Sequence, residues 1–212
     1  MATAPRPGEA MQRLEPLLGV DGCVRLARAL IARAGRWAAA VGPTWIAYAP
    51  RDGDARGDAR AEIASLAPAG ARLFEQDGAD TGARLSHAFG EVAAAHGGPV
   101  IVIGTDQPRL GRSHAWATLD DLRDDVDVCL GPDTSGGYYL LAAREPHPAL
   151  FGIDPSAWGG PRVMALTLEA LVGAELRMGW LSSERALAGP ADAKALLADP
   201  CAPPDIVAAL RG

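Results

Sequence analysis

Short apolar runs alternate with amphipathic segments along almost the whole chain. Apolar runs predict strands, and apolar positions that recur every three or four residues predict helices. The predicted strands cover residues 44–50, 71–76, 99–106, 127–132, 138–144 and 175–181. Helices are predicted over 22–40, around 63–66, over 83–95 and 113–123, and after Pro161 and Pro190.

The helix over 22–40 and the strand over 99–106 show the clearest patterns. Within 22–40, apolar residues such as Leu26, Leu30 and Ala34 recur at helical spacing, and Asp21 is placed to cap the helix. The run PVIVIGTD at 99–106 is nearly continuously apolar, which is typical of a strand buried on both faces. Ser113 is expected to cap a helix, and Pro161 is expected to occupy the first helical position.

The alternation of strands and helices predicts an α/β protein, a three-layer sandwich around a mostly parallel sheet. In such folds ligands bind at the carboxyl ends of the strands. The loops after Ile103, Gln76, Leu130 and Leu181 are therefore the ones expected to carry chemistry.

Composition narrows the class of protein. The length of 212 residues suits one domain spanning 1–212, and 49% hydrophobic with 22% charged residues is typical of a globular protein. A net charge of −6 argues against a nucleic-acid partner. No apolar run reaches the roughly 20 residues of a membrane span, and the N-terminus lacks a signal peptide's apolar core. We therefore expect a cytoplasmic protein without a membrane partner, and the oligomeric state stays open.

Asp106 is the first candidate for chemistry, because it ends the apolar run at the edge where ligands bind. A carboxylate there can hold a divalent cation that bridges phosphate oxygens, and Mg²⁺ typically takes one or two protein carboxylates. The structural alternative is that Asp106 caps a turn that leads into Pro108.

Two further loops have the composition of ligand-binding loops. In APRPGEAMQRL (4–14), backbone N–H groups around Gly8 could approach a phosphate, and Arg13 could pair with one. In QDGADTGARL (76–85), Gln76 could present its amide to a nucleobase, while Gly78 and Gly82 would allow close approach. Either loop could equally be structural, and the second would then carry a helix N-cap at 80 or 81.

The stretch SGGYY at 135–139 allows two interpretations. Gly136 and Gly137 accept a tight turn, which would make the stretch a plain hairpin. The alternative is the floor of a site that cradles a ligand. No dinucleotide-binding glycine motif, P-loop or nucleophile elbow occurs in the chain.

Taken together, these stretches resemble the motifs of the DUF2064 family. These are bacterial proteins of the GT-A (nucleotide-diphospho-sugar transferase) superfamily, akin to the guanylyltransferase CofC. The resemblance runs in the family's order from Ala4 to Leu197 and includes VIGTDQPRL, GPDTSGGYYLLA, PHPALF and the tryptophan Trp158. It implies a GT-A fold, a nucleotide or nucleotide-sugar ligand, and a divalent metal, Mg²⁺ or Mn²⁺.

The chain departs from the family pattern where charge would be needed. Met11 stands in a lysine position, and Ser135 stands where the family has the aspartate of D-G-G-Y. Ala186 and Ala188 replace the two acids of D-V-D-T-P, one of which would complete the metal site. Such losses weaken phosphate neutralisation and metal binding together. The family's first strand is expected to be missing or truncated, because the true start lies upstream or because the strand is lost.

The resemblance leads to two hypotheses for the function. The first is a nucleotide- or sugar-nucleotide-dependent transferase of nucleotidyl or glycosyl groups, with reduced activity as a variant. The second is a catalytically degenerate GT-A-like binding or partner module. Asp106 and Asp133 are the candidate catalytic residues, and Asp106 is the candidate metal ligand. Asp133 and Glu184 each lie two positions from a lost acid and could compensate for it. The candidate substrate-binding residues are Gly8, Arg13, Gln76, Gly78, Gly82, Ser135, Gly136, Gly137 and Trp158.

Overall fold

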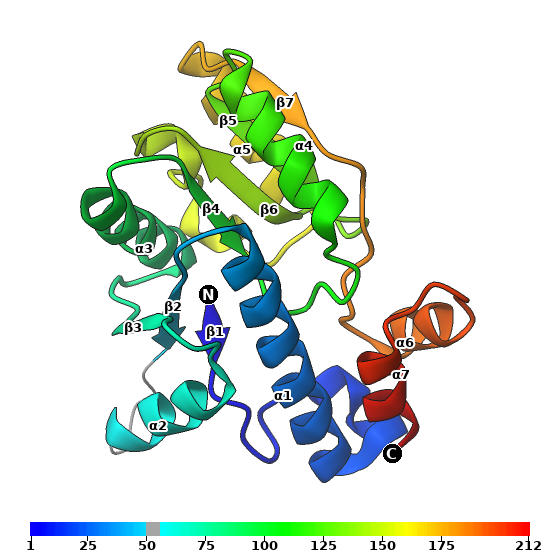
Figure 1. The fold of residues 1–212 in the computed structure, drawn as a ribbon. Helices are drawn as coiled ribbons and strands as arrows, with labels where there is room; N and C mark the ends of the chain where they lie inside the picture. The colour runs from blue at the N-terminus through cyan, green and yellow to red at the C-terminus, as the bar shows by residue number, and fades with distance from the viewer. Residues whose placement is uncertain (50–55) are drawn as a thin grey trace. The chain divides into compact units, whose positions relative to one another are not determined.

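The computed structural model describes residues 1–49 and 56–212, which form two compact units (Figure 1). Unit 1 comprises Met1–Glu75, Gly104–Leu110 and Arg185–Gly212. Unit 2 comprises Gln76–Ile103 and Gly111–Glu184. That residues 1–212 form one domain stays a prediction.

The sheet of unit 1 has three parallel strands. They are β1 (Ala2–Thr3), β2 (Trp45–Ala49) and β3 (Arg72–Glu75), in the order β1-β2-β3. Helix α2 (Arg56–Leu66) packs against this sheet because Ile63 and Ala59 share a buried cluster with residues of β1 and β2. The N-terminal strand is thus present in unit 1 as a pair of residues, with Ala2 opposite Tyr48.

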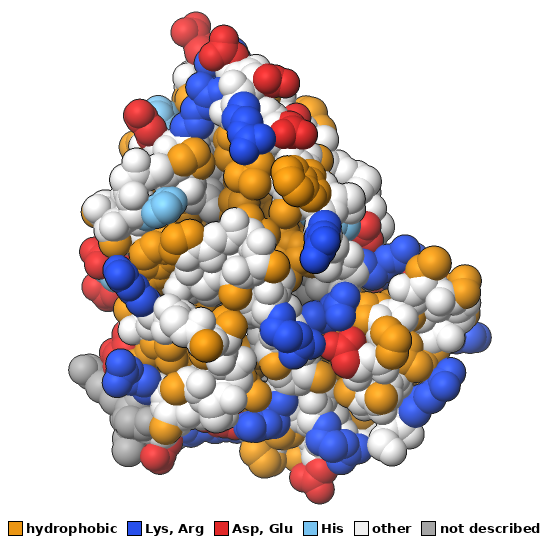
Figure 2. Space-filling model, in the orientation of Figure 1, with side chains coloured by type: hydrophobic (Ala, Val, Ile, Leu, Met, Phe, Trp, Pro, Cys, Tyr) orange, Lys and Arg blue, Asp and Glu red, His pale blue; other side chains and the backbone are white. Residues whose placement is uncertain are grey.

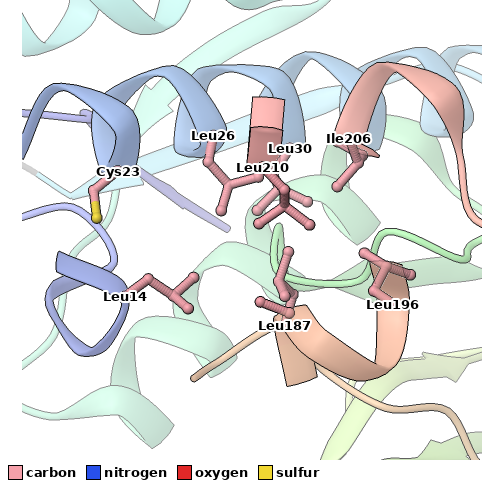
Figure 3. Packing of buried hydrophobic residues seen from close by; sticks show 9 residues of the cluster. Leu14, Cys23, Leu26, Leu30, Leu187, Leu196, Ile206 and Leu210 are labelled. Atoms are coloured by element: carbon pink, nitrogen blue, oxygen red, sulfur yellow. The ribbon is translucent and has the colours of Figure 1, made fainter. Parts of the chain in front are cut away.

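A second cluster of unit 1 joins its long helix to the C-terminal helices (Figure 3). Helix α1 (Glu15–Val41) follows the 3-10 turn η1 (Gln12–Leu14) and is interrupted at Gly19, whose φ of 67° is not helical. Leu26 and Leu30 of α1 pack with α6 (Pro190–Leu197) and α7 (Pro204–Arg211). The cluster members with no exposed surface are Leu14, Leu26, Ala193 and Ile206.

The sheet of unit 2 is mixed. Its strands are β4 (Val100–Ile103), β6 (Tyr138–Ala143), β5 (Val128–Pro132) and β7 (Met178–Trp180), in the order β4-β6-β5-β7. Strand β6 runs antiparallel to β4 and β5, whereas β5 and β7 are parallel. The unit also contains α3 (Thr81–His96), α4 (Arg112–Arg123), α5 (Val163–Gly173) and the short turns η2 (Pro148–Leu150) and η3 (Pro155–Ala157).

The predicted α/β class is confirmed, because the described strands pair mainly in parallel and alternate with helices along the chain. Every predicted strand is found with shorter bounds, and the predictions 99–106 and 175–181 were the longest overestimates. Residue 50 of the first predicted strand lies outside the described part. Among the described residues, no helix has the length and apolar character of a membrane span.

Several local predictions are wrong. Gly111, rather than Ser113, is the N-cap of α4, since the His114 side chain already bonds the Gly111 N–H. Arg162 caps α5, which places Pro161 before the helix. Asp21 lies inside α1 because that helix begins earlier. Residues 101–103 of β4 are only partly buried, and helix α7 was not predicted.

An ion-pair network ties the starts of β5 and β7 together at one end of unit 2. Arg177 lies 3.1 Å from Asp127 and 3.4 Å from Asp125, and Arg144 lies 3.8 Å from Asp125. Figure 2 shows acidic and basic side chains intermixed at the top of the view, where the turns that lead into β5 and β7 lie. The Arg177 guanidinium donates hydrogen bonds to Asp127 and lowers the pKa of that carboxyl.

Candidate functional site

The candidate site residues divide between the two units. Gly8, Arg13 and Asp106 belong to unit 1. The remaining candidates belong to unit 2: Gln76, Gly78, Gly82, Asp133, Ser135, Gly136, Gly137 and Trp158.

Asp106 lies in the segment Gly104–Leu110, which is anchored through its backbone. The carbonyl oxygen of Asp106 accepts a hydrogen bond from the N–H of Leu187 at 2.9 Å. Nε of Arg33 on α1 donates to the carbonyl oxygen of Pro108 at 2.6 Å. Asp106 itself is exposed, and its carboxylate folds back so that a Cβ on Gly104 would stand 2.8 Å from Oδ1. Unit 1 thus holds Asp106 at a fixed place on its surface.

The stretch in the position of the family's D-V-D-T-P runs beside Asp106. Leu187, which bonds the Asp106 carbonyl, is flanked by Ala186 and Ala188, whose methyl groups cannot ligate a metal. The next acid, Asp192, accepts hydrogen bonds from the N–H groups of Ala188 at 3.2 Å and Gly189 at 2.9 Å. Asp192 therefore serves the start of α6.

These residues do not fit the Mg²⁺ or Mn²⁺ site that the resemblance implies. A site with two acids needs a second carboxylate beside Asp106, and Ala186 and Ala188 provide none. Within residues 1–49 and 56–212, no three His, Cys, Asp or Glu side chains gather in a metal-binding arrangement. The metal-ligand role of Asp106 stays a prediction, and no chemical step below depends on a metal.

The loop 4–14 is folded by local hydrogen bonds. Gly8 has a positive φ of 74°, and its carbonyl oxygen accepts from Nε2 of Gln12 at 2.8 Å. Met11, in the family's lysine position, packs against the α1–α6–α7 cluster instead of carrying a charge. Arg13 is exposed on η1. The loop therefore keeps the arginine of the family pattern at Arg13 and carries no charge at the family's lysine position.

The carboxylate of Asp133 holds the turn between β5 and β6. Its Oδ1 accepts hydrogen bonds from the N–H and hydroxyl of Ser135, each at 2.6 Å, and from the N–H of Gly137 at 3.1 Å. The stretch thus forms a hairpin whose turn Asp133 shapes, and its role as the floor of a ligand site stays a prediction. A catalytic role for Asp133 stays a prediction.

Glu184 lies next to Asp133 through an isolated parallel bridge between the two residues. Its Oε1 lies 3.3 Å from Nε2 of His114, a buried residue of α4. Because Nδ1 of His114 accepts the Gly111 N–H at 3.1 Å, the ring proton sits on Nε2 and points at Glu184. The two proposed compensating acids are neighbours, but Glu184 fixes the start of α4.

Gly82 and Gly136 allow close backbone packing inside unit 2. A Cβ on Gly82 would stand 2.6 Å from the carbonyl oxygen of Phe151 and 2.8 Å from Nε1 of Trp158. A Cβ on Gly136, which has a φ of 96°, would stand 2.8 Å from Pro161 Cα. The segment 151–162 therefore packs against both glycines, which brings Trp158 to the hairpin and to the start of α3.

The base-side loop is ordered by Asp80. Its side chain accepts a hydrogen bond from the Ala83 N–H at 2.9 Å and so caps α3, which confirms one of the two expected caps. Gly78 has a φ of 138° and approaches the backbone N of Arg84 closely enough to exclude a side chain. Gln76 was predicted to end the strand and instead directly follows β3.

The sequence did not single out Thr167 or Tyr138 of unit 2 as candidate site residues. Tyr138 contacts Trp158 edge-to-face, with ring centroids 6.4 Å apart. Thr167 is fully buried on α5. Its signal in the sequence was a single hydroxyl within the otherwise apolar helical run VMALTLEALV, which local patterns do not distinguish from a tolerated core threonine.

The fold identifies the class of protein. The chain resembles a crystal structure described as that of a "putative nucleotide-diphospho-sugar transferase" from Desulfovibrio desulfuricans G20, with a TM-score of 0.84 and 26% sequence identity. The match covers 99% of this chain and 91% of that chain. The protein thus has a GT-A-like, nucleotide-diphospho-sugar transferase fold. No curated protein matches the chain.

The family follows from the sequence match. The model of the family described as "Uncharacterized protein conserved in bacteria (DUF2064)" matches residues 31–159. The chain belongs to the DUF2064 family. The matched range includes Asp106, the hairpin at 131–142 and Trp158, which are among the residues that carried the resemblance, whereas the loop 4–14 lies outside it.

Proposed function

We propose that this protein is a nucleotide- or nucleotide-sugar-dependent transferase that moves a nucleotidyl or glycosyl group. The observation that carries the proposal is the structural match over 99% of the chain to a protein described as a "putative nucleotide-diphospho-sugar transferase". Its support from the residues is the retained framework around Asp106, the loop 4–14 and the hairpin 133–137.

The candidate residues take the following roles in this proposal. Arg13 pairs with a ligand phosphate through its guanidinium, and Asp106 faces the reacting part of the ligand. Gln76 and Gly78 contact the nucleobase side. The hairpin around Ser135 contacts the acceptor side. A fixed guanidinium and backbone N–H groups stabilise phosphate charge by position alone.

The second candidate function is a GT-A-like module that binds a ligand or partner with little catalysis. Ala186 and Ala188 on either side of Leu187 favour it, because Asp106 then lacks the neighbouring carboxylate of the family motif. A metal-assisted transfer without its second acid should be slower by orders of magnitude.

A thermal-shift titration separates the two functions. Purified protein is titrated with GTP, CTP, UTP and UDP- or GDP-sugars, with and without Mg²⁺ or Mn²⁺. A ligand at a hundred times its Kd raises the free energy of unfolding by about 2.7 kcal/mol, which a melting curve detects. Metal-enhanced binding with turnover supports the transferase. Metal-independent binding without turnover, or no binding of any nucleotide, supports the module and contradicts the transferase.

A matched pair of variants tests the phosphate contact. Arg13→Ala should weaken nucleotide affinity about tenfold, since it removes the charged residue of the loop 4–14 that is proposed to reach the phosphate. Arg60→Ala removes an exposed arginine on α2 and should leave affinity unchanged. Equal affinities of the two variants would remove Arg13 from the site.

A further inference from the structure

The segment Gly104–Leu110, which carries Asp106, has no helix or strand of its own. Its exposed residues are Asp106 and Arg109, and the residues between and after these two are buried. An irregular segment keeps one conformation only if contacts with its surroundings offset the entropy cost of ordering it. The contacts of this segment therefore decide where the Asp106 carboxylate lies.

The C-terminal part of unit 1, Arg185–Gly212, makes two polar contacts with this segment. The N–H of Leu187 donates to the Asp106 carbonyl at 2.9 Å. The Arg109 guanidinium forms an ion pair with Asp199, which lies just after α6. Leu187 is itself buried in the cluster that joins α1, α6 and α7 (Figure 3), so the hydrogen bond to the segment starts from a packed residue.

Arg33 links the same segment to α7. Nε of Arg33 donates to the Pro108 carbonyl at 2.6 Å, and Nη1 of Arg33 lies 3.1 Å from Oδ1 of Asp205 in the first turn of α7. Arg36, also on α1, lies 2.8 Å from Oδ2 of the same carboxylate. The planar guanidinium presents several donors in fixed directions, so one arginine can hold a carbonyl and a carboxylate at once. Arg33 thereby makes the position of segment 104–110 depend on α7.

The stretch around Leu187 provides a backbone contact where the family has acids. Ala186 and Ala188 stand at the positions of those acids and cannot ligate a metal. The N–H of the residue between them bonds the Asp106 carbonyl, and a backbone hydrogen bond does not need the replaced side chains. This stretch can therefore hold Asp106 in place without ligating a metal.

We propose that the C-terminal helices α6 and α7 brace the Asp106 segment, and that Arg33 is the positioning residue that couples α7 to it. The inference rests on the proposed function only in giving Asp106 a role toward the ligand. It deepens that function by assigning the residues that set where Asp106 lies. Arg33 acts through the Pro108 carbonyl and not on the ligand itself.

The test follows the exchange of one backbone amide hydrogen with solvent. Because the Leu187 N–H donates to the Asp106 carbonyl, the exchange rate of that amide rises when segment 104–110 leaves its place. In isotope-labelled protein, NMR should show this amide exchanging about five- to tenfold faster in Arg33→Met than in wild type. Asp205→Asn should also accelerate the exchange, and Asp205→Glu, which keeps the carboxylate, should restore the wild-type rate.

Two controls separate position from general stability. The Leu181 amide, which donates to the Leu130 carbonyl of unit 2 at 2.9 Å, should keep its exchange rate in every variant. Arg28→Met removes another arginine of α1, whose ion pair with Glu62 of α2 at 3.1 Å includes no residue of the segment. It should leave the exchange rate of the Leu187 amide unchanged.

The proposal requires a faster Leu187 amide in both Arg33→Met and Asp205→Asn, and a wild-type rate in either variant overturns it. An equal acceleration in Arg28→Met also overturns it, because the effect would then be one of stability and not of position.

Ligand affinity separates this inference from the proposed function. Where wild type binds a nucleotide in the thermal-shift titration, Arg33→Met should weaken that affinity about fivefold, while Arg28→Met should leave it unchanged. Unchanged affinity in Arg33→Met beside a fast Leu187 amide would limit Arg33 to stability and overturn its positioning role. Wild-type protein that binds no nucleotide contradicts the transferase, and the exchange rates alone then support or overturn the brace.

Discussion

Replacing Gly136 by alanine should destabilise the protein strongly although it adds one methyl group. Gly136 has a φ of 96°, a region that costs a residue with a Cβ about 1–2 kcal/mol. The added Cβ would also stand 2.8 Å from Pro161 Cα, and nearer still to its carbonyl oxygen. Moving Pro161 away loosens the hydrogen bond from the Met164 N–H to Gly136, worth about 1 kcal/mol.

The backbone strain and the weakened hydrogen bond together should lower the free energy of unfolding by about 2–3 kcal/mol. At roughly 2–4 °C per kcal/mol, the Tm of Gly136→Ala should fall by about 5–10 °C. The assay is thermal and urea denaturation of Gly136→Ala beside Gly90→Ala. Gly90 lies in α3 with no atom within 4 Å of an added Cβ, so alanine there should add about 0.5–1 kcal/mol. An unchanged Tm for Gly136→Ala, together with lost nucleotide affinity, would refute the packing role and make this glycine a ligand contact.

Three further outcomes are expected. Asp127→Asn should lower the free energy of unfolding by about 1 kcal/mol at pH 7, measured by urea denaturation. Arg177 lowers the pKa of Asp127, so the stability that this ion pair contributes is present above the unfolded pKa of 3.8 and is lost as the pH falls through the folded pKa. A stability difference between wild type and Asp127→Asn that persists at about pH 2 would contradict this. Asp133→Ala should lower the free energy of unfolding by about 1–2 kcal/mol, because Oδ1 of Asp133 accepts three hydrogen bonds in the turn. Unchanged stability with lost activity would instead make Asp133 catalytic. Burial raises the pKa of Cys129 to about 12, so at pH 8 a thiol reagent should modify exposed Cys201 and spare Cys129 until the protein unfolds.

Local patterns were sufficient to predict most of the secondary structure. The spacing of Leu26 and Leu30 placed α1, and the apolar run at 99–106 placed β4, because one face or one run of side chains must leave water. Helix boundaries were less predictable. The cap of α4 depends on a bond between the His114 side chain and the Gly111 N–H, which the identity of Ser113 does not reveal.

The candidate site was predictable in its parts but not in its roles. Gly82 and Gly136 stood out in the sequence as residues that allow a ligand to approach. The structure shows that protein backbone, from Phe151 and Pro161, occupies the space beside them. A glycine marks a close approach in either case, and only the fold decides what approaches.

By itself, the sequence determined the α/β class, the family and the positions where family charges are replaced, since these depend on composition, period and motif order. Only the tertiary structure decided that Leu187 bonds the backbone of Asp106 and that Glu184 contacts His114. Those contacts join residues far apart in the chain. They form because strands and helices bury their apolar faces together, and no local pattern encodes which distant residue that packing brings near.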